Sequence, residues 1–189
     1  MTPIRTLLVY ASGEVNKTFS YQTGWPQQFL AHRAFRCTPI NLLDRRWHSR
    51  VGRALKVRQS RADAVVLLHS VFSNGRLLDG HLFDAIRKLA CCKAYFIGNE
   101  YKLIPEKMQF CEDLGISLLV SQTTDATVHQ MYRERLGCAV VGIPNTGFDP
   151  VLFRATQPWA GRPIDVGYRA DHSPRYLGHQ ERQIGRAHV

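Results

Sequence analysis

The segment AVVLLHS, residues 64–70, decides the fold. Five apolar residues stand in a row without a polar break, and two polar residues follow at once. An unbroken apolar run is typical of a strand covered on both faces, as in a parallel sheet, because a strand with one wet face alternates apolar and polar residues. Similar, mostly unbroken runs occur at residues 6–10, 40–43, 94–97, 117–120 and 139–143. The sequence therefore predicts six buried strands.

Helical patterns separate these runs. Two apolar stripes predict helices, the first through Phe29, Leu30, Arg33 and Ala34, and the second through Leu82, Phe83, Ile86, Leu89 and Ala90.

Two later helices are marked by their ends as well as by their stripes. Proline near the start and glycine just past the end are expected of a helix, which predicts one from Pro105 to Gly115 with Met108, Cys111 and Leu114 inward. Residues 125–136 repeat the pattern, with Thr124 or Asp125 as N-cap, Gly137 as C-cap, and Val128, Tyr132 and Leu136 inward.

Strands that alternate with helices over short connections predict an α/β fold, a Rossmann-like doubly wound parallel sheet. The segment 155–163, rich in proline and small residues, reads as a linker, and a new strand is expected at 164–169.

Composition sets broad limits on the class of protein. Hydrophobic residues make up 44% of the 189, enough for a real core, and no stretch approaches the roughly 20 apolar residues that span a bilayer. The N-terminus lacks the apolar run of a signal peptide, so a cytoplasmic protein is expected. The cysteines are odd in number and contain no CxxC pair, which favours small buried side chains over a metal or redox role.

The formal net charge of +10 is concentrated in the first third of the chain. Residues 1–62 carry eleven Lys and Arg against two acids, and residues 45–61 carry no acid at all. A solvated helix face explains such a run most simply, but it also suits docking on an anionic membrane, with Trp47, Val51 and Ala54 on one face. The cations proposed for that contact are Arg45, Arg46, Arg50, Arg53 and Lys56. A single tryptophan within the run argues against nucleic-acid binding.

Ligands of open parallel sheets bind beyond the carboxyl ends of the strands, which selects a few loops before any motif is considered. The candidate acceptor-binding residues in these loops are Ser12, Gly13, Ser70, Asn99, Tyr101, Asn145 and Thr146, and the candidate catalytic residues are His69 and Glu100.

Each candidate also has a structural interpretation. His69 suits a general base or a hydrogen bond to a hydroxyl, but backbone partners at a strand end would account for it equally well. Glu100 could orient an acceptor hydroxyl or could serve the loop before Pro105. The turn at Asn145 and Thr146 needs no ligand to explain it.

Several motifs are absent from the sequence. There is no GxGxxG or Walker loop, no GxSxG elbow, and no HExxH or Cys/His pattern with zinc spacing. No cofactor and no metal are expected.

One family resemblance rests on the later part of the chain. The segments SQTTDATVHQMYRERLGCAVVGIPNTGFDPVLFRA (121–155) and RPIDVGYRADHSPRYLGHQER (162–182) resemble GT-B glycosyltransferases of the family-4-like and spore-maturation CgeB-like groups. The matching turn is Pro144, Asp149, Pro150 and Phe153, and the segments at 62–70 and 97–103 look similar to the acceptor-side domain of such enzymes.

The resemblance implies a two-domain enzyme that moves a sugar from a nucleotide-sugar to a hydroxyl on a glycan, a lipid or a small molecule. Residues 1–154 would bind the acceptor, and residues 164–183 would begin the donor domain. Gly167, Tyr168 and Arg169 would approach the donor phosphates, and His69 is similar in place to a histidine that many relatives keep near the sugar.

The chain is also expected to be cut short. Residues 184–189, IGRAHV, are the translation of a widely used short-read sequencing adapter, which predicts an artefact in place of most of a donor domain. The fragment itself is then expected to be inactive. The alternative left open by the sequence is a non-enzymatic, flavodoxin-like binding or regulatory module.

Overall fold

The computed structural model describes residues 2–13, 20–44, 50–73, 75–143 and 161. The chain divides into two units, Met1–Gly147 and Phe148–Val189, and the fold below is that of the first. The predicted linker and the strand at 164–169 lie outside the described residues.

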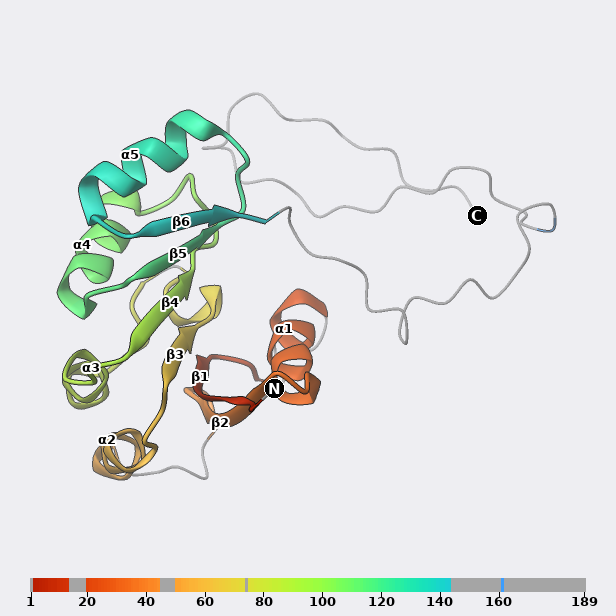
Figure 1. Ribbon diagram of the computed structural model, residues 1–189, viewed down its shortest axis with the longest axis vertical. Helices are drawn as coiled ribbons and strands as arrows, with labels where there is room; N and C mark the ends of the chain where they lie inside the picture. Colours follow the sequence, from red (N-terminus) through yellow and green to blue (C-terminus); the bar gives the residue numbers. More distant parts are fainter. Residues whose placement is uncertain (1, 14–19, 45–49, 74, 144–160, 162–189) are drawn as a thin grey trace. The chain divides into compact units, whose positions relative to one another are not determined.

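A parallel sheet of six strands forms the centre of the first unit (Figure 1). The strand order is β2-β1-β3-β4-β5-β6, and every neighbouring pair is parallel. The strands are β1 (Ile4–Tyr10), β2 (Phe35–Asn41), β3 (Ala64–Leu67), β4 (Cys92–Phe96), β5 (Leu118–Ser121) and β6 (Ala139–Gly142). The predicted Rossmann-like α/β sheet is thereby confirmed.

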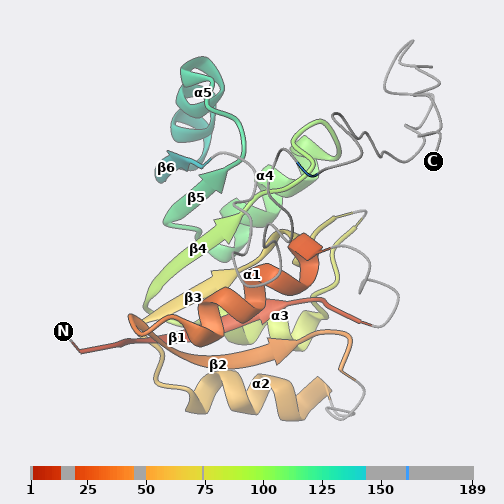
Figure 2. The same ribbon diagram turned by 90° about the vertical axis from the view of Figure 1, so that its right-hand side faces the viewer.

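Helices cover both faces of the sheet. Helix α1 (Ser20–Ala31) lies on one face, and four helices lie on the other (Figures 1 and 2). These four are α2 (Arg50–Gln59), α3 (Gly80–Arg87), α4 (Ile104–Leu114) and α5 (Ala126–Leu136). No helix of the described ranges is long and apolar enough to cross a membrane.

The register of the strands builds one core on each face. Val9, Leu67, Tyr95, Leu119 and Val140 stand side by side across five strands and are buried under α2–α5. The next row, Leu8, Val66 and Ala94, is buried on the α1 face. This double burial explains the unbroken apolar runs, since neither face of a central strand meets water.

Three sequence predictions need correction. Helix α3 ends at Arg87, so Leu89 and Ala90 of its predicted stripe lie beyond it. The second strand begins at Phe35 and ends at Asn41, not at 40–43, because this edge strand is only half covered and alternates polar and apolar residues through Pro39. The first helix ends at Ala31, so Arg33 and Ala34 lie beyond it, and Leu30 is 45% exposed rather than inward.

The predicted ends of the last two helices are confirmed. Gly115 and Gly137 both adopt left-handed backbone conformations, with φ of 65° and 61°, as C-caps of α4 and α5. Of the two N-cap candidates for α5, Asp125 holds the position, and its carboxylate accepts from the Thr127 amide at 2.8 Å.

Candidate functional site

The loops that follow β1, β3 and β4 meet at the carboxyl edge of the sheet. The strand order reverses between β1 and β3, which is where ligands bind in sheets of this type. The predicted residues gathered at this edge are Ser12 and Gly13 after β1, His69 and Ser70 in the one-turn 3-10 helix η2 (His69–Val71), and Asn99, Glu100 and Tyr101 after β4. The other predicted site residues lie outside the described residues: Asn145, Thr146, Gly167, Tyr168 and Arg169.

Hydrogen bonds hold the loops of β1 and β3 together. The Ala11 amide donates to the buried Ser70 hydroxyl at 2.9 Å, across the point where the strand order reverses. The Asn41 side chain accepts from the Ser12 amide at 3.0 Å and donates to the Ser12 carbonyl at 2.7 Å. Ser70 therefore has a structural task at this edge, and the Ser12 backbone is fixed.

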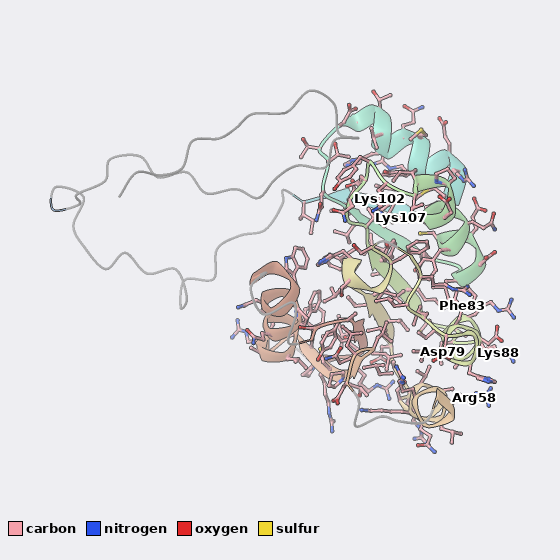
Figure 3. All side chains as sticks on the ribbon, turned by 180° about the vertical axis from the view of Figure 1, so that it is seen from behind. Arg58, Asp79, Phe83, Lys88, Lys102 and Lys107 are labelled. Carbon is pink, nitrogen blue, oxygen red and sulfur yellow. The ribbon has the colours of Figure 1, made fainter. Side chains whose placement is uncertain are left out.

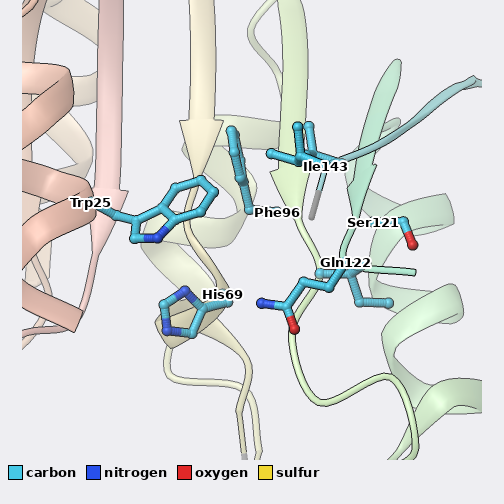
Figure 4. Close-up of a pocket in the computed structure, with 8 residues that line it drawn as sticks. Trp25, His69, Phe96, Ser121, Gln122 and Ile143 are labelled. Atoms are coloured by element: carbon cyan, nitrogen blue, oxygen red, sulfur yellow. The ribbon is translucent and has the colours of Figure 1, made fainter. Parts of the chain in front are cut away.

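A small hollow opens at the same edge between α1, η2 and the ends of β4 and β5. Its lining is Trp25, His69, Phe96, Ile97, Val120, Ser121, Gln122 and Ile143 (Figure 4). The Trp25 and Phe96 rings meet edge to face, with centroids 4.9 Å apart. The hollow has room for about one water molecule.

His69 and Gln122 face each other across this hollow, beside the Trp25 ring (Figure 4). Burial lowers the pKa of His69 below its ordinary value, so the imidazole is neutral at pH 7. A neutral imidazole can accept a proton or a hydrogen bond, and the side-chain amide of Gln122 can both donate and accept hydrogen bonds.

Glu100 is engaged by its own protein on both carboxylate oxygens. Its Oε1 accepts hydrogen bonds from the backbone amides of Gln122 at 2.6 Å and Thr123 at 3.2 Å. The Tyr132 hydroxyl donates to Oε2 at 2.9 Å, and the Ser121 hydroxyl lies 2.8 Å from the same oxygen. Of the two interpretations of Glu100, this geometry favours the structural one.

Lys107 is a feature that the sequence analysis missed. Its side chain is 0% exposed and lies inside the molecule, near the loop that carries Lys102 (Figure 3). The Nζ atom donates to the Gly98 carbonyl at 2.6 Å and to the Asn99 carbonyl at 2.9 Å. Desolvation lowers the pKa of this lysine to about 8, against the opposing attraction of the Glu100 charge.

Asn99 and Tyr101 lie nearer to solvent than the hollow does. The Asn99 amide donates to the Ser73 hydroxyl at 3.3 Å, and the Tyr101 side chain is 61% exposed. Both remain available to a ligand larger than the hollow.

The signals for the missed residues were present in the sequence. Lys107 falls on the stripe of Cys111 and Leu114, where a lysine among inward positions marks a buried cation that needs partners. Trp25 and Pro26 lie in the middle of α1, ahead of the stripe at Phe29 and Leu30 that predicted this helix.

Two cationic side chains of helix α2 donate hydrogen bonds to backbone carbonyls of β2 and of the turn that follows it. The Arg53 guanidinium donates to the Leu42 carbonyl and the Lys56 ammonium to the Pro39 carbonyl, both at 3.3 Å. Ala54 is buried in the core, so its predicted place on a membrane-facing surface is wrong. Arg45, Arg46 and Trp47 lie outside the described residues.

Within the described ranges, no three His, Cys, Asp or Glu side chains gather as a metal site. Comparison with known proteins gives no family model, no curated protein and no solved structure that matches this chain.

Proposed function

We propose that this chain carries the acceptor-binding domain of a glycosyltransferase of the GT-B type. The parent enzyme would transfer a sugar from a nucleotide-sugar donor to a hydroxyl of a glycan, lipid or small molecule. The doubly wound sheet is compatible with this proposal but does not select it, because sheets of this kind serve many functions.

The observation that carries the proposal is the composition of the hollow at the carboxyl edge. It combines the Trp25 and Phe96 rings with the polar groups of His69 and Gln122. A sugar ring has apolar C–H faces and a rim of hydroxyls, so it suits an aromatic wall with a few convergent polar groups. Since the hollow holds only about one water, the sugar would lie across its mouth and reach His69 and Gln122 with one edge.

In this proposal His69 has the role of general base. Its neutral imidazole would take the proton of the acceptor hydroxyl while that oxygen bonds to the anomeric carbon and the nucleoside diphosphate leaves. Glu100 has no such role, because both of its oxygens already accept hydrogen bonds. Gly167, Tyr168 and Arg169 stay predicted as donor-phosphate contacts, with the nucleotide-sugar as substrate and no cofactor.

Saturation-transfer NMR with a panel of methyl hexosides and methyl N-acetylhexosaminides tests acceptor binding. We expect transfer to at least one glycoside, and its loss in the variants Trp25→Ala, His69→Ala and Gln122→Ala. His81→Ala is the matched control, because His81 is an exposed histidine on α3, on the face of the sheet opposite α1 (Figure 1). Transfer that is unaffected by all three hollow variants would place the sugar elsewhere and remove the proposal's main support.

A non-enzymatic binding module is the second candidate, and the full engagement of Glu100 favours it. With that carboxylate occupied, the described hollow offers one histidine and no available acid. Extending the gene in its source DNA beyond the codon for Gln183 separates the two candidates. A second β/α region with a basic pair and an acidic ribose-binding motif would support the enzyme, and a stop within a few codons would support the module.

Contact with an anionic membrane at the inner face of the cell remains a separate proposal. Arg53 and Lys56 already donate to backbone carbonyls, so this contact depends mainly on Arg45, Arg46 and Arg50. Co-sedimentation with vesicles should show binding that requires anionic lipid, and equal recovery with neutral vesicles would remove the idea.

A further inference from the structure

The loop that follows β4 is held from inside by a buried cation. Residues 98–103 lie in the connection from β4 to α4, and Lys107, in the first turn of α4, reaches back to the carbonyls of Gly98 and Asn99. Burying an ammonium is costly unless hydrogen bonds and an opposite charge compensate. The two carbonyls supply the bonds, and Glu100 supplies the charge.

The same loop is held from the next strand by a half-buried anion. Glu100 leaves the loop and enters a cradle formed by the amides of Gln122 and Thr123 and the hydroxyls of Ser121 and Tyr132. The cradle joins the end of β5 to helix α5. Charge-assisted bonds of this kind are shorter and stronger than neutral ones, and the bond to the Gln122 amide is 2.6 Å long.

The backbone on either side of Glu100 enters the left-handed region, which costs little at asparagine and more at leucine. Asn99 and Leu103 have positive φ values of 49° and 54°, a region that a branched side chain such as leucine rarely enters. Strain of this kind persists only where the surroundings over-determine the chain, and it is concentrated at functional sites.

Lys107 and Glu100 each act on one side of the hollow, Lys107 through Gly98 and Glu100 through the backbone of Gln122. The Gly98 backbone lies against His69, so that a Cβ added at Gly98 would stand 2.8 Å from the His69 Cβ. The Gln122 amide is bound by Glu100, and the Gln122 side chain is the wall opposite His69 (Figure 4). Lys107 thus fixes the peptide that supports His69, and Glu100 fixes the residue that faces it.

We infer that Lys107 and Glu100 are positioning residues that set the separation of His69 and Gln122 across the hollow. Neither touches a ligand. Their task is to hold the loop 98–103 in its strained form, so that both walls stand ready before a ligand arrives. The inference deepens the proposed function by taking this hollow as its binding site, and it makes no use of which ligand binds.

NMR of the histidine side chains tests the inference without any ligand. The variants are Lys107→Met and Glu100→Gln, and the readout is the titration midpoint of His69. If the pair holds the walls together, either change admits water, and the midpoint rises towards the ordinary histidine value in both variants. A purely electrostatic effect would instead move the midpoint in opposite directions, because one variant removes a positive charge and the other a negative charge.

Two further measurements make the outcome decisive. In Glu100→Gln, which keeps the size of the side chain, we expect the backbone amide proton signal of Gln122 to move upfield as its short charge-assisted hydrogen bond weakens. In Glu100→Ala, added formate should occupy the vacated cradle and restore the His69 midpoint. Asp125→Ala is the matched control, because this carboxylate also accepts from a backbone amide but lies at the exposed start of α5.

The inference is overturned if the His69 midpoint and the Gln122 amide signal in Glu100→Gln are the same as in the Asp125→Ala control, or if the two charge variants shift the midpoint in opposite directions. The saturation-transfer experiment that tests the proposed function uses different variants and a different signal. A failure of one experiment therefore leaves the other standing.

Discussion

At the scale of single residues, the burial of the charged Lys107 side chain makes the stability of this protein depend on pH. Lys107 is fully buried, and desolvation lowers its pKa from the ordinary 10.5 to about 8. Between these two values the unfolded chain binds a proton at this residue that the folded chain has lost. The contribution of Lys107 to the free energy of unfolding therefore rises with pH from about 8 to 10.5 and is constant below that window.

We predict the effect of Lys107→Met from this sign. The difference in the free energy of unfolding between the wild type and this variant should move in favour of the wild type by up to ~3 kcal/mol as the pH rises through the window. Urea denaturation at several pH values measures it. Lys88→Met, at an exposed lysine, should show no such trend, and other titrating groups cancel because all three chains share them.

A second residue-scale prediction concerns the glycine beside His69. A Cβ at position 98 would lie 2.8 Å from the His69 Cβ, which is backbone-anchored and cannot rotate away. Gly98→Ala should lower the free energy of unfolding by about 1–3 kcal/mol, as overpacking does. Gly80→Ala is the matched control, since nothing lies within 4 Å of its added methyl group. Equal stability of the two variants in thermal melts would contradict this account.

At the scale of elements, caps decide where helices begin and end. The Asp79 carboxylate accepts from the Leu82 amide at 3.0 Å and so satisfies one unpaired donor in the first turn of α3. The apolar stripe of this helix includes Leu82 and Phe83, both buried. The cap and the stripe therefore agree on the position of α3.

Replacing that cap tests the argument. Asp79→Ala should lower the free energy of unfolding by ~1 kcal/mol, whereas Asp79→Asn should lose much less, because asparagine is an equally good N-cap. Chemical denaturation of the two variants gives the comparison. If asparagine cost as much as alanine, the charge of Asp79 rather than its cap would be the stabilising feature.

The strands at the centre of the sheet were predicted well because they are covered on both sides. The runs at 64–68 and 117–120 match β3 and β5 within one residue, because buried parallel strands exclude polar residues along their length. The strand β2 was misplaced because it lies at the edge, where Arg36 is exposed and no unbroken run forms. Helix α1 was predicted from a stripe that continues to Ala34, whereas the helix ends at Ala31.

The candidate site was predicted only in part, for a physical reason. The rule that ligands bind at carboxyl ends of strands selected His69 and Glu100 from one strand end each. It could not tell that Glu100 would turn into the cradle beyond β5, since that pairing depends on Tyr132 and the Gln122 amide, more than twenty residues away along the chain.

At the scale of the whole molecule, the reactivity of the cysteines can be used to follow unfolding. None is paired among the described residues, and they differ in exposure: Cys92 is exposed, whereas Cys111 is buried in the main core. Burial raises the pKa of the Cys111 thiol to about 12, so the reactive thiolate is scarce as long as the core is closed.

Thiol labelling should therefore distinguish the exposed cysteine from the buried one. We expect Cys92 to react with Ellman's reagent at once in the native protein, and Cys111 to react only at the rate at which the core unfolds. Mass spectrometry of labelled peptides over a urea series separates the two. Labelling of Cys111 that runs ahead of the loss of secondary structure would show that α4 detaches before the rest of the sheet.

Arg53 and Lys56 of α2 also protect the edge strand β2. An open strand edge is a template on which another chain can add a strand and begin a fibril. In β2 the ring of Pro39 removes one donor, and Lys56 and Arg53 occupy carbonyls of the strand and the turn that follows it. Part of the positive charge of this chain thus occupies backbone acceptors at the strand and the turn that an added strand would otherwise meet.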